Sequence, residues 1–235
     1  MTSLSRRDFL AGSAAIVGFG AMPSLAQADS FEDFIEGLIE VQTPRQGGVL
    51  TYGNPVPNWA LGQSDKGQHA YYFMDIQTRG IWNALTWVDE DLNVRPELAT
   101  KFVSNEDGTV WEYTLREGVF FHNGKEFTSE DAVASARHHA HPDFGGVGFF
   151  KQYVKHVEPM GKYGVRFILT RPNVEFAYAT AEYRAMMMPA MEDISKMGFD
   201  GIGTGAFKLI EIDNKRQFRA EKVEGFWMPA RPFLD

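Results

Sequence analysis

The densest group of side chains that could bind a metal ion in this sequence is a set of three neighbouring histidines: His138, His139 and His141. The first and the last are three positions apart, so they would share one face of a helix. Pro142 ends such a helix at once, however, and no nearby set of carboxylates completes a tetrahedral site. The run 186–188 offers thioether sulfurs without the other ligands that a metal needs, and we interpret it as apolar filler of the core. We therefore expect no metal site and no cofactor.

Covalent chemistry has equally little support in the sequence. There is no cysteine, which excludes disulfides, thiolate metal sites, iron–sulfur clusters and cysteine nucleophiles. The sequence also lacks the dinucleotide motif Gly-x-Gly-x-x-Gly after a strand, the Gly-x-Ser-x-Gly elbow and the His-Glu-x-x-His pair. We therefore expect no catalytic residue and a function that depends on non-covalent binding.

The first 28 residues have the three parts of an export signal. The paired Arg6 and Arg7 precede Phe-Leu, a weakly apolar run covers residues 11–25, and Ala26 and Ala28 form a small-x-small cleavage site. The apolar run is shorter than the ~20 residues that a membrane anchor needs. We therefore expect a twin-arginine signal that is cleaved after Ala28, the twin-arginine translocase as a partner during export, and a periplasmic protein.

Cleavage at that site changes the formal net charge from −8 to −9, because it removes two arginines and one aspartate. This acidic balance disfavours nucleic acid and anionic lipid as partners. The remaining 207 residues are rich in Phe, Tyr and Trp and suffice for one large domain or two small ones.

The clearest local pattern is the period-two alternation over residues 110–116, which predicts a strand with one buried face. We interpret the aromatic and apolar residues of this region as a core face and not as a binding platform: Trp111, Tyr113, Leu115, Phe120, Phe121 and Phe127.

Other elements follow from spacing, caps and turn residues. Asn123-Gly124 predicts a tight turn, and Thr128 with Asp131 predicts a capped helix that extends over 132–140. The remaining expected elements are a helix over 30–41, a strand over 49–53, a buried helix over 71–87, a helical turn at 96–99, a strand over 165–169, a helix over 177–188, and a Gly-rich loop that enters a strand over 202–210. We expect the acidic amphipathic helix 30–41 to pack on its own core, and a partner-binding arm is the alternative.

Several separate motifs resemble, in order and spacing, those of the periplasmic solute-binding proteins of ABC importers, in the dipeptide, oligopeptide and nickel-binding family (solute-binding protein family 5). The most specific is the block 111–133, WEYTLREGVFFHNGKEFTSEDAV. The others are Gly47-Gly48-x-Leu50, Pro96-Glu97-Leu98-Ala99, the Pro172 segment and Gly203-Thr204-Gly205-Ala206-Phe207-Lys208-Leu209. The resemblance covers residues 47–235 in one register.

The resemblance implies an α/β, two-lobed periplasmic-binding-protein-like (type II) fold that traps its ligand by hinge closure. Members of the family are considerably longer, so we expect a fragment that holds only the first lobe and its associated subdomain. The expected organisation is a signal peptide over 1–28, a helix and linker over 29–46, first-lobe segments over 47–60 and 168–235, and an inserted subdomain over 61–167.

The ligand-facing residues that we expect lie mainly in the loop after the first strand, since such loops open into the crevice of α/β lobes. Asn58 could bond to a peptide backbone and Trp59 could form an apolar wall, with Pro57 and Ala60 beside them; a rigid surface turn is the alternative. Thr204 lies between two glycines that permit close backbone approach, and we favour a structural role there over ligand contact.

The resemblance implies a binding protein that captures a peptide or similar small solute and delivers it to a membrane permease. An exported enzyme is one alternative, because the twin-arginine route often carries cofactor-loaded oxidoreductases. A sensory module that keeps the fold but signals to a partner is another.

Overall fold

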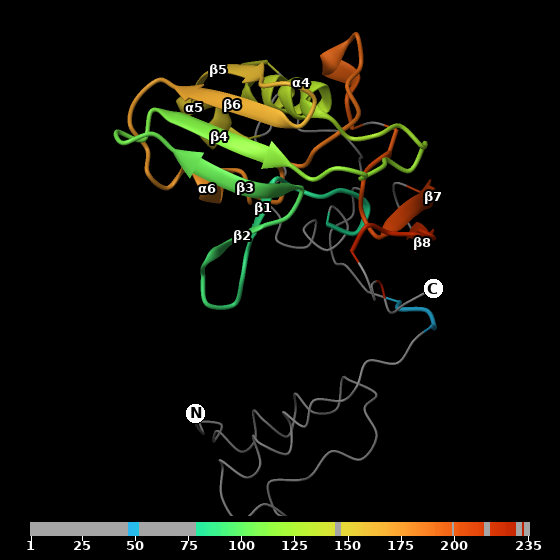
Figure 1. The fold of residues 1–235 in the computed structure, drawn as a ribbon. Helices are drawn as coiled ribbons and strands as arrows, with labels where there is room; N and C mark the ends of the chain where they lie inside the picture. Colours follow the sequence, from blue (N-terminus) through green and yellow to red (C-terminus); the bar gives the residue numbers. More distant parts are fainter. Residues whose placement is uncertain are drawn as a thin grey trace, which may run out of the picture. The chain divides into compact units, whose positions relative to one another are not determined.

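The computed structural model describes residues 47–51, 79–143, 147–198, 200–213, 217–228 and 232, all within the compact unit Gln46–Asp235 (Figure 1). The predicted signal, the helix 30–41, the loop 54–60 and the first part of the helix 71–87 lie outside the described residues. Among the described residues, no helix is long and apolar enough to cross a membrane.

A four-stranded antiparallel sheet forms the centre of the described fold. Its strands follow the order β3 (Ala99–Ser104), β4 (Val110–Leu115), β6 (Gly164–Leu169) and β5 (Val154–Pro159) (Figure 1). Trp111 of β4 pairs with Phe167 of β6, which in turn pairs with Val157 of β5. The strands expected over 110–116 and 165–169 are thus confirmed.

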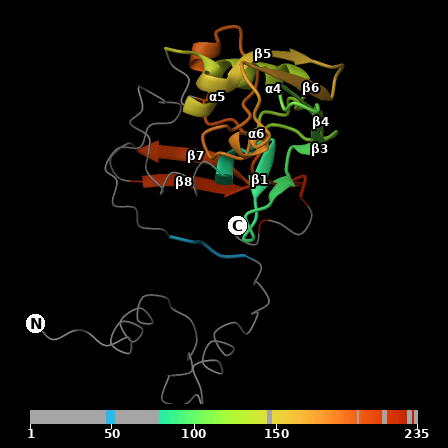
Figure 2. The same ribbon diagram turned by 90° about the vertical axis from the view of Figure 1, so that its left-hand side faces the viewer.

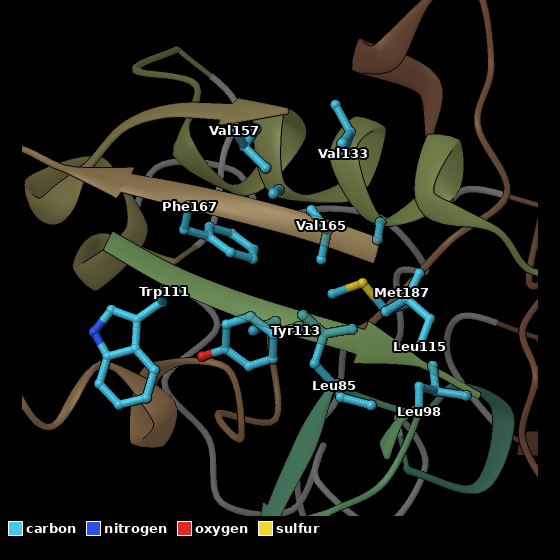
Figure 3. Packing of buried hydrophobic residues seen from close by; sticks show 14 of the residues in the cluster. Leu85, Leu98, Trp111, Tyr113, Leu115, Val133, Val157, Val165, Phe167 and Met187 are labelled. Carbon is cyan, nitrogen blue, oxygen red and sulfur yellow. The ribbon is translucent and has the colours of Figure 1, made fainter. Parts of the chain in front are cut away.

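One face of this sheet carries the main core, because every second residue of β4 is buried there. Three helices supply the covering side chains: α4 (Ser129–Ala140), α5 (Gly148–Tyr153) and α6 (Phe176–Ala179). Phe150 of α5 and Phe176 of α6 both contact the ring of Phe167, with centroids 6.0 and 5.3 Å apart. Figure 3 shows the side chains of Tyr113, Phe167 and Met187 within this cluster.

The aromatic residues predicted to form a core face are buried with one exception. Trp111, Tyr113, Phe121 and Phe127 belong to the main core. Phe120 was expected there and is instead 56% exposed. It lies between the buried Val119 and Phe121 and forms a bridge with Glu126, so the alternation of the extended chain turns its ring outward.

The start of α4 confirms the predicted cap. The carboxylate of Asp131 accepts hydrogen bonds from the backbone N–H of Thr128 at 2.9 Å and from its hydroxyl at 3.2 Å. The preceding turn at Asn123-Gly124 is also present, with Gly124 at a φ of +84°. Asp131 additionally binds Ala190 N–H at 2.8 Å and Lys125 Nζ, so it joins three segments of the chain.

Two helical expectations fail around the small hairpin of β1 (Thr86–Val88) and β2 (Val94–Pro96). Residues 79–81 are helical, but the helix expected as far as Trp87 does not continue, because the chain enters β1. The helical turn expected at Pro96 is absent as well, since the N–H groups of Glu97 and Ala99 donate to the carbonyl of Leu85 at 3.2 and 2.9 Å.

The helix expected over 177–188 ends at Ala179. Beyond it, the backbone N–H of Met187 donates to the Asn83 carbonyl at 2.9 Å, and that of Met188 to the Ser135 hydroxyl at 2.9 Å. These bonds to distant segments replace the bonds of a continuous helix. The short 3-10 helix η1 (Ile194–Lys196) follows.

A second, smaller core lies beside the hairpin of β7 (Phe207–Asp213) and β8 (Gln217–Lys222), seen side by side in Figure 2. Its buried members are Ile81, Trp82, Ala84, Met186, Met188 and Met197, with Phe207, Leu209 and Ala220 packed against them. The predicted Gly-rich loop that enters a strand at 207 is confirmed, and it connects this core to the rest of the fold.

Candidate functional site

Of the sequence-predicted ligand residues, the structure describes only Thr204. Pro57, Asn58, Trp59 and Ala60 lie outside the described residues, as do Arg6, Arg7, Ala26 and Ala28 of the expected export signal. The candidate site is therefore built outward from Thr204 and the loop that holds it.

Thr204 is 1% exposed, and its side-chain hydroxyl and its backbone carbonyl oxygen both form hydrogen bonds. Its hydroxyl donates to Asn83 Oδ1 at 3.0 Å, and its carbonyl accepts a hydrogen bond from the indole N–H of Trp227 at 3.1 Å. The same indole lies 3.4 Å from Asn83 Oδ1. Thr204 thus joins two segments that are far apart in the sequence.

The two glycines that flank Thr204 allow this loop to lie directly against the segment 80–82. The backbone N–H of Gly205 donates to the Ile81 carbonyl at 2.8 Å, and the indole of Trp82 donates to the Ile202 carbonyl at 2.9 Å. A Cβ on Gly203 would lie 1.9 Å from the Ile81 carbonyl oxygen, and one on Gly205 would lie 2.4 Å from that of Gly80. The predicted close backbone approach is therefore present.

Glu97 lies at the other end of this network, and sequence reasoning did not single it out as a site residue. Its Oε1 accepts a hydrogen bond from Asn83 Nδ2 at 2.9 Å, and its Oε2 accepts one from the Ala84 N–H at 3.0 Å. Burial raises the pKa of Glu97 to about 7, against the opposing effects of these hydrogen bonds and of the charge of Arg79. This carboxyl group therefore changes charge near neutral pH.

His122 holds the loop from its opposite side. The Gly203 N–H donates to His122 Nδ1 at 3.3 Å, and His122 Nε2 lies 3.0 Å from the Gly205 carbonyl oxygen. This pair of contacts requires a neutral ring with its proton on Nε2. Burial lowers the pKa of His122, which favours that neutral form.

We call this set the Asn83 junction, and it comprises Asn83, Glu97, His122, Thr204 and Trp227. A guanidinium lies beside it, because Arg116 is positioned over the Trp227 ring at 4.9 Å and donates through Nε to the Glu97 carbonyl at 3.2 Å. The junction consists of hydrogen bonds and aromatic contacts. It can therefore hold backbone segments and aromatic rings in place without covalent bonds.

A second group of charged side chains lies in and beside the segment that follows α6. Arg184 Nε donates to Glu182 Oε1 at 2.6 Å, and its guanidinium lies 5.3 Å from the centre of the Tyr183 ring. Arg79 Nη2 donates to the neighbouring Ala181 carbonyl at 2.9 Å. The charge of Arg79 also lowers the pKa of Glu97. This segment therefore lies close to the Asn83 junction.

Two of the three clustered histidines, His138 and His139, are buried and hold α4 against neighbouring segments. His138 Nδ1 lies 2.6 Å from the Ile194 carbonyl oxygen, and His139 Nε2 lies 2.8 Å from that of Met186. Burial lowers the pKa of His139 to about 3. Within the part of the chain that the structure describes, no group of three His, Cys, Asp or Glu residues could hold a metal ion.

Comparison with known proteins gives a consistent family for this chain. A family model described as bacterial extracellular solute-binding proteins, family 5, middle, matches residues 93–235. The oligopeptide-binding protein AppA of Bacillus subtilis is 28% identical over 206 residues, which cover 82% of this chain and 36% of AppA. The glutathione-binding protein GsiB of Salmonella paratyphi A is 29% identical over 163 residues, covering 67% of this chain and 31% of GsiB.

Solved structures give the same fold. AppA in complex with a nonapeptide matches with a TM-score of 0.67 at 26% identity, over 82% of this chain and 40% of that structure. The periplasmic binding protein DppA from Helicobacter pylori, in complex with the peptide STSA, matches with a TM-score of 0.68 at 21% identity, over 82% of this chain and 42% of that structure. The predicted type II periplasmic-binding-protein fold is therefore confirmed, and the chain spans about 40% of these structures. It spans about a third of the length of the two curated relatives.

Proposed function

The chain belongs to family 5 of the bacterial extracellular solute-binding proteins, and on that premise we propose that it is the extracytoplasmic substrate-binding component of an ABC importer that captures a peptide or a similar small solute. The observation that carries the proposal is the match of the family model over residues 93–235. The names of its relatives support a peptide ligand, since AppA is named for oligopeptides and GsiB for the tripeptide glutathione. Its partners in this role are the solute and the membrane permease.

Ligand contact is assigned to two segments. The first is the loop with Pro57, Asn58, Trp59 and Ala60, which combines an amide for a peptide backbone with an aromatic wall. The second is the loop around Thr204. Because the Thr204 hydroxyl already donates to Asn83, this loop contributes through its backbone and its fixed position, and not through a free hydroxyl.

On this proposal residues 47–60 and 168–235 form the first-lobe segments of the binding protein and residues 61–167 its inserted subdomain, with β6 (Gly164–Leu169) crossing the boundary between them. The central sheet of the described fold, from β3 to β6, contributes no residue of the Asn83 junction; Glu97 precedes β3 and His122 follows β4. In this arrangement the sheet holds Glu97 and His122 in position. Glu97 contacts Asn83, and His122 contacts the Gly-rich loop.

Export by the twin-arginine pathway completes the proposal. Replacing Arg6 and Arg7 together by lysine keeps the charge but removes the paired guanidinium groups that define the signal. We expect the uncleaved precursor to accumulate in the cytoplasm, detected by cell fractionation. An unchanged periplasmic level of the double variant would contradict this route.

The binding proposal is tested by thermal melting of the full-length protein with pools of di-, tri- and nonapeptides. A ligand that binds only the folded state raises the melting temperature, and a concentration of 100 times Kd stabilises by about 2.7 kcal/mol. The expected result is a shift with at least one peptide pool and none with free amino acids. Turnover of a peptide, with release of fragments, would favour the alternative of an exported enzyme. A shift caused only by a protein partner would favour a sensory module.

A further inference from the structure

Arg116, which lies beside the Asn83 junction, is a half-buried cation without a carboxylate partner. Several other arginines of the described fold form ion pairs with carboxylates: Arg95, Arg166, Arg184 and Arg219. Within the part of the chain that the structure describes, Arg116 donates one side-chain hydrogen bond, and its acceptor is a backbone carbonyl. Partly buried charges are usually paired, so this guanidinium has the properties of a site for an external anion.

The guanidinium of Arg116 is fixed on one edge and on one face. Its Nε donates to the Glu97 carbonyl at 3.2 Å, and its Cζ lies 4.9 Å from the centre of the Trp227 ring. Trp227 is itself held, because its indole N–H donates to the Thr204 carbonyl at 3.1 Å. The orientation of the guanidinium is therefore set before any ligand binds, which lowers the entropy that a ligand must overcome.

The remaining edge of the guanidinium carries Nη1 and Nη2. Neither nitrogen donates to any residue that the structure describes. Because no buried side-chain nitrogen or oxygen in the described residues lacks a hydrogen-bond partner, both Nη groups of Arg116 reach the solvent. This edge presents two parallel N–H groups, which match the two oxygens of a carboxylate.

The surroundings of this edge leave room for a carboxylate from outside. The carboxyl group of Glu97 does not take the position, because its two oxygens accept hydrogen bonds from Asn83 and Ala84. The rings of Phe226 and Trp227 are half-buried, with centroids 5.2 Å apart, and add aromatic surface beside the guanidinium. A carboxylate attached to an apolar group fits a cation bordered by aromatic rings.

We propose that the Nη1–Nη2 edge of Arg116 binds a carboxylate group of the captured solute. This inference rests on the proposed function, since it names a chemical feature by which the binding protein selects its solute. Arg116 is a binding residue in this proposal. Trp227 is a positioning residue, because it acts on the solute through the guanidinium and connects it to the loop around Thr204.

A peptide offers carboxylates of two kinds, at its C-terminus and on Asp or Glu side chains. Calorimetry of the full-length protein with four peptide pools distinguishes them: free or amidated C-termini, each with or without Asp and Glu. A bidentate, charge-assisted pair corresponds to a dissociation constant ~10- to 100-fold lower for pools that carry the recognised carboxylate than for the amidated, acid-free pool. The pool that shows this preference identifies the source of the carboxylate.

The Arg116→Gln variant assigns the preference to this side chain. Glutamine removes the cation and the paired N–H groups, so the acid and amide pools should bind this variant equally. The comparison is between two ligands of one variant, and a loss of stability therefore does not alter it. Arg116→Lys keeps the charge without the planar edge and should retain only part of the preference; it also serves where Arg116→Gln does not fold.

Two further variants complete the set. Trp227→Leu removes the ring under the guanidinium but no charge, and it should reduce the ratio of the acid and amide affinities. Arg171→Gln is the matched control, because the Arg171 guanidinium also lies over an aromatic ring, that of Tyr153 at 4.6 Å, and contacts no residue of the Asn83 junction. This control should keep the wild-type preference.

The outcomes separate this inference from the function on which it rests. Equal affinity of the wild type for acid and amide pools would overturn the carboxylate site and leave solute binding intact. A preference for carboxylates that persists in Arg116→Gln would place their recognition at other residues and overturn the role of Arg116. Binding of none of the four pools would contradict the proposed function itself.

Discussion

The glycine at position 203 gives the sharpest test of the site geometry. A Cβ built on Gly203 lies 1.9 Å from the Ile81 carbonyl oxygen and 2.7 Å from Trp82 Cδ1. Real Cβ atoms do not approach other atoms within 3.0 Å, so the loop and the segment 80–82 must separate by about 1 Å in Gly203→Ala. The contact with the Ile81 carbonyl cannot be relieved by a side-chain rotation, because the backbone itself is in the way.

That separation breaks specific hydrogen bonds. The bonds from Gly205 N–H to Ile81, from the Trp82 indole to Ile202, and from the Thr204 hydroxyl to Asn83 measure 2.8, 2.9 and 3.0 Å. An extension of about 1 Å takes each of them beyond a hydrogen-bond distance. At about 0.5 to 1.5 kcal/mol for each bond, Gly203→Ala should lower the free energy of unfolding by about 2 to 4 kcal/mol.

Urea unfolding followed by fluorescence measures this loss in the full-length protein. Gly148→Ala is the matched control, because its Cβ meets no atom within 4 Å and Gly148 is the first residue of α5. That change should leave stability unchanged or raise it by up to ~1 kcal/mol, since alanine is the better helix former. A free energy of unfolding for Gly203→Ala within about 0.5 kcal/mol of the wild type would refute the close approach of the loop.

Three further predictions follow from the burial and contacts of individual side chains. The pKa of Glu97 is higher in the folded state than in the unfolded state, so its contribution to stability is complete below pH 4.5 and is lost as pH rises through about 7. The expected loss in the free energy of unfolding is about 3 kcal/mol. Denaturant unfolding as a function of pH should show this loss in the wild type and not in Glu97→Gln. Asp131→Ala should cost about 3 kcal/mol in urea unfolding, because it leaves the N–H groups of Thr128 and Ala190 without their acceptor, and a loss below 1 kcal/mol would contradict the role of this carboxylate in joining three segments. Phe167→Ala should cost about 3 to 5 kcal/mol, since its ring is fully buried between Tyr113, Phe150 and Phe176; a smaller loss than in Phe120→Ala, at the 56% exposed Phe120, would show that the core is misplaced.

The elements that sequence patterns predicted correctly are those fixed by local rules. The strand over 110–115 follows from alternation, and the start of α4 follows from the pairing of Thr128 with Asp131 three residues later. The turn at Asn123-Gly124 requires the positive φ that Gly124 adopts. Each of these features depends on residues within a few positions of one another.

The elements that were wrong are those decided by distant partners. The segment after Ile81 has apolar residues at helical spacing, but its backbone pairs with residues 97–99 and then forms β1. The segment after Ala179 has helix-forming residues, but the N–H of Met187 bonds to Asn83, more than 100 positions earlier. Hydrophobic spacing alone does not distinguish a buried helix from buried extended chain.

The Asn83 junction was only half accessible to sequence reasoning. The alternating glycines at 203 and 205 were a usable signal, and the close approach they predicted is present. Glu97 and Asn83 gave no such signal, because their importance comes from contacts with each other and with Thr204 and Trp227, up to 144 positions away. The burial of Glu97, which raises its pKa to about 7, arises only when these segments are brought together in space.

Native mass spectrometry of the protein purified from the periplasm is the sharpest test of whether it binds a solute. One spectrum reads the mass of the intact chain together with any small molecule retained in it. We expect a chain that has lost residues 1–28 and carries a peptide or similar small solute. This solute should be released on unfolding and be replaced by peptides of the pool that shifts the melting temperature. A folded periplasmic protein that retains no small molecule and takes up none from any peptide pool would contradict this expectation.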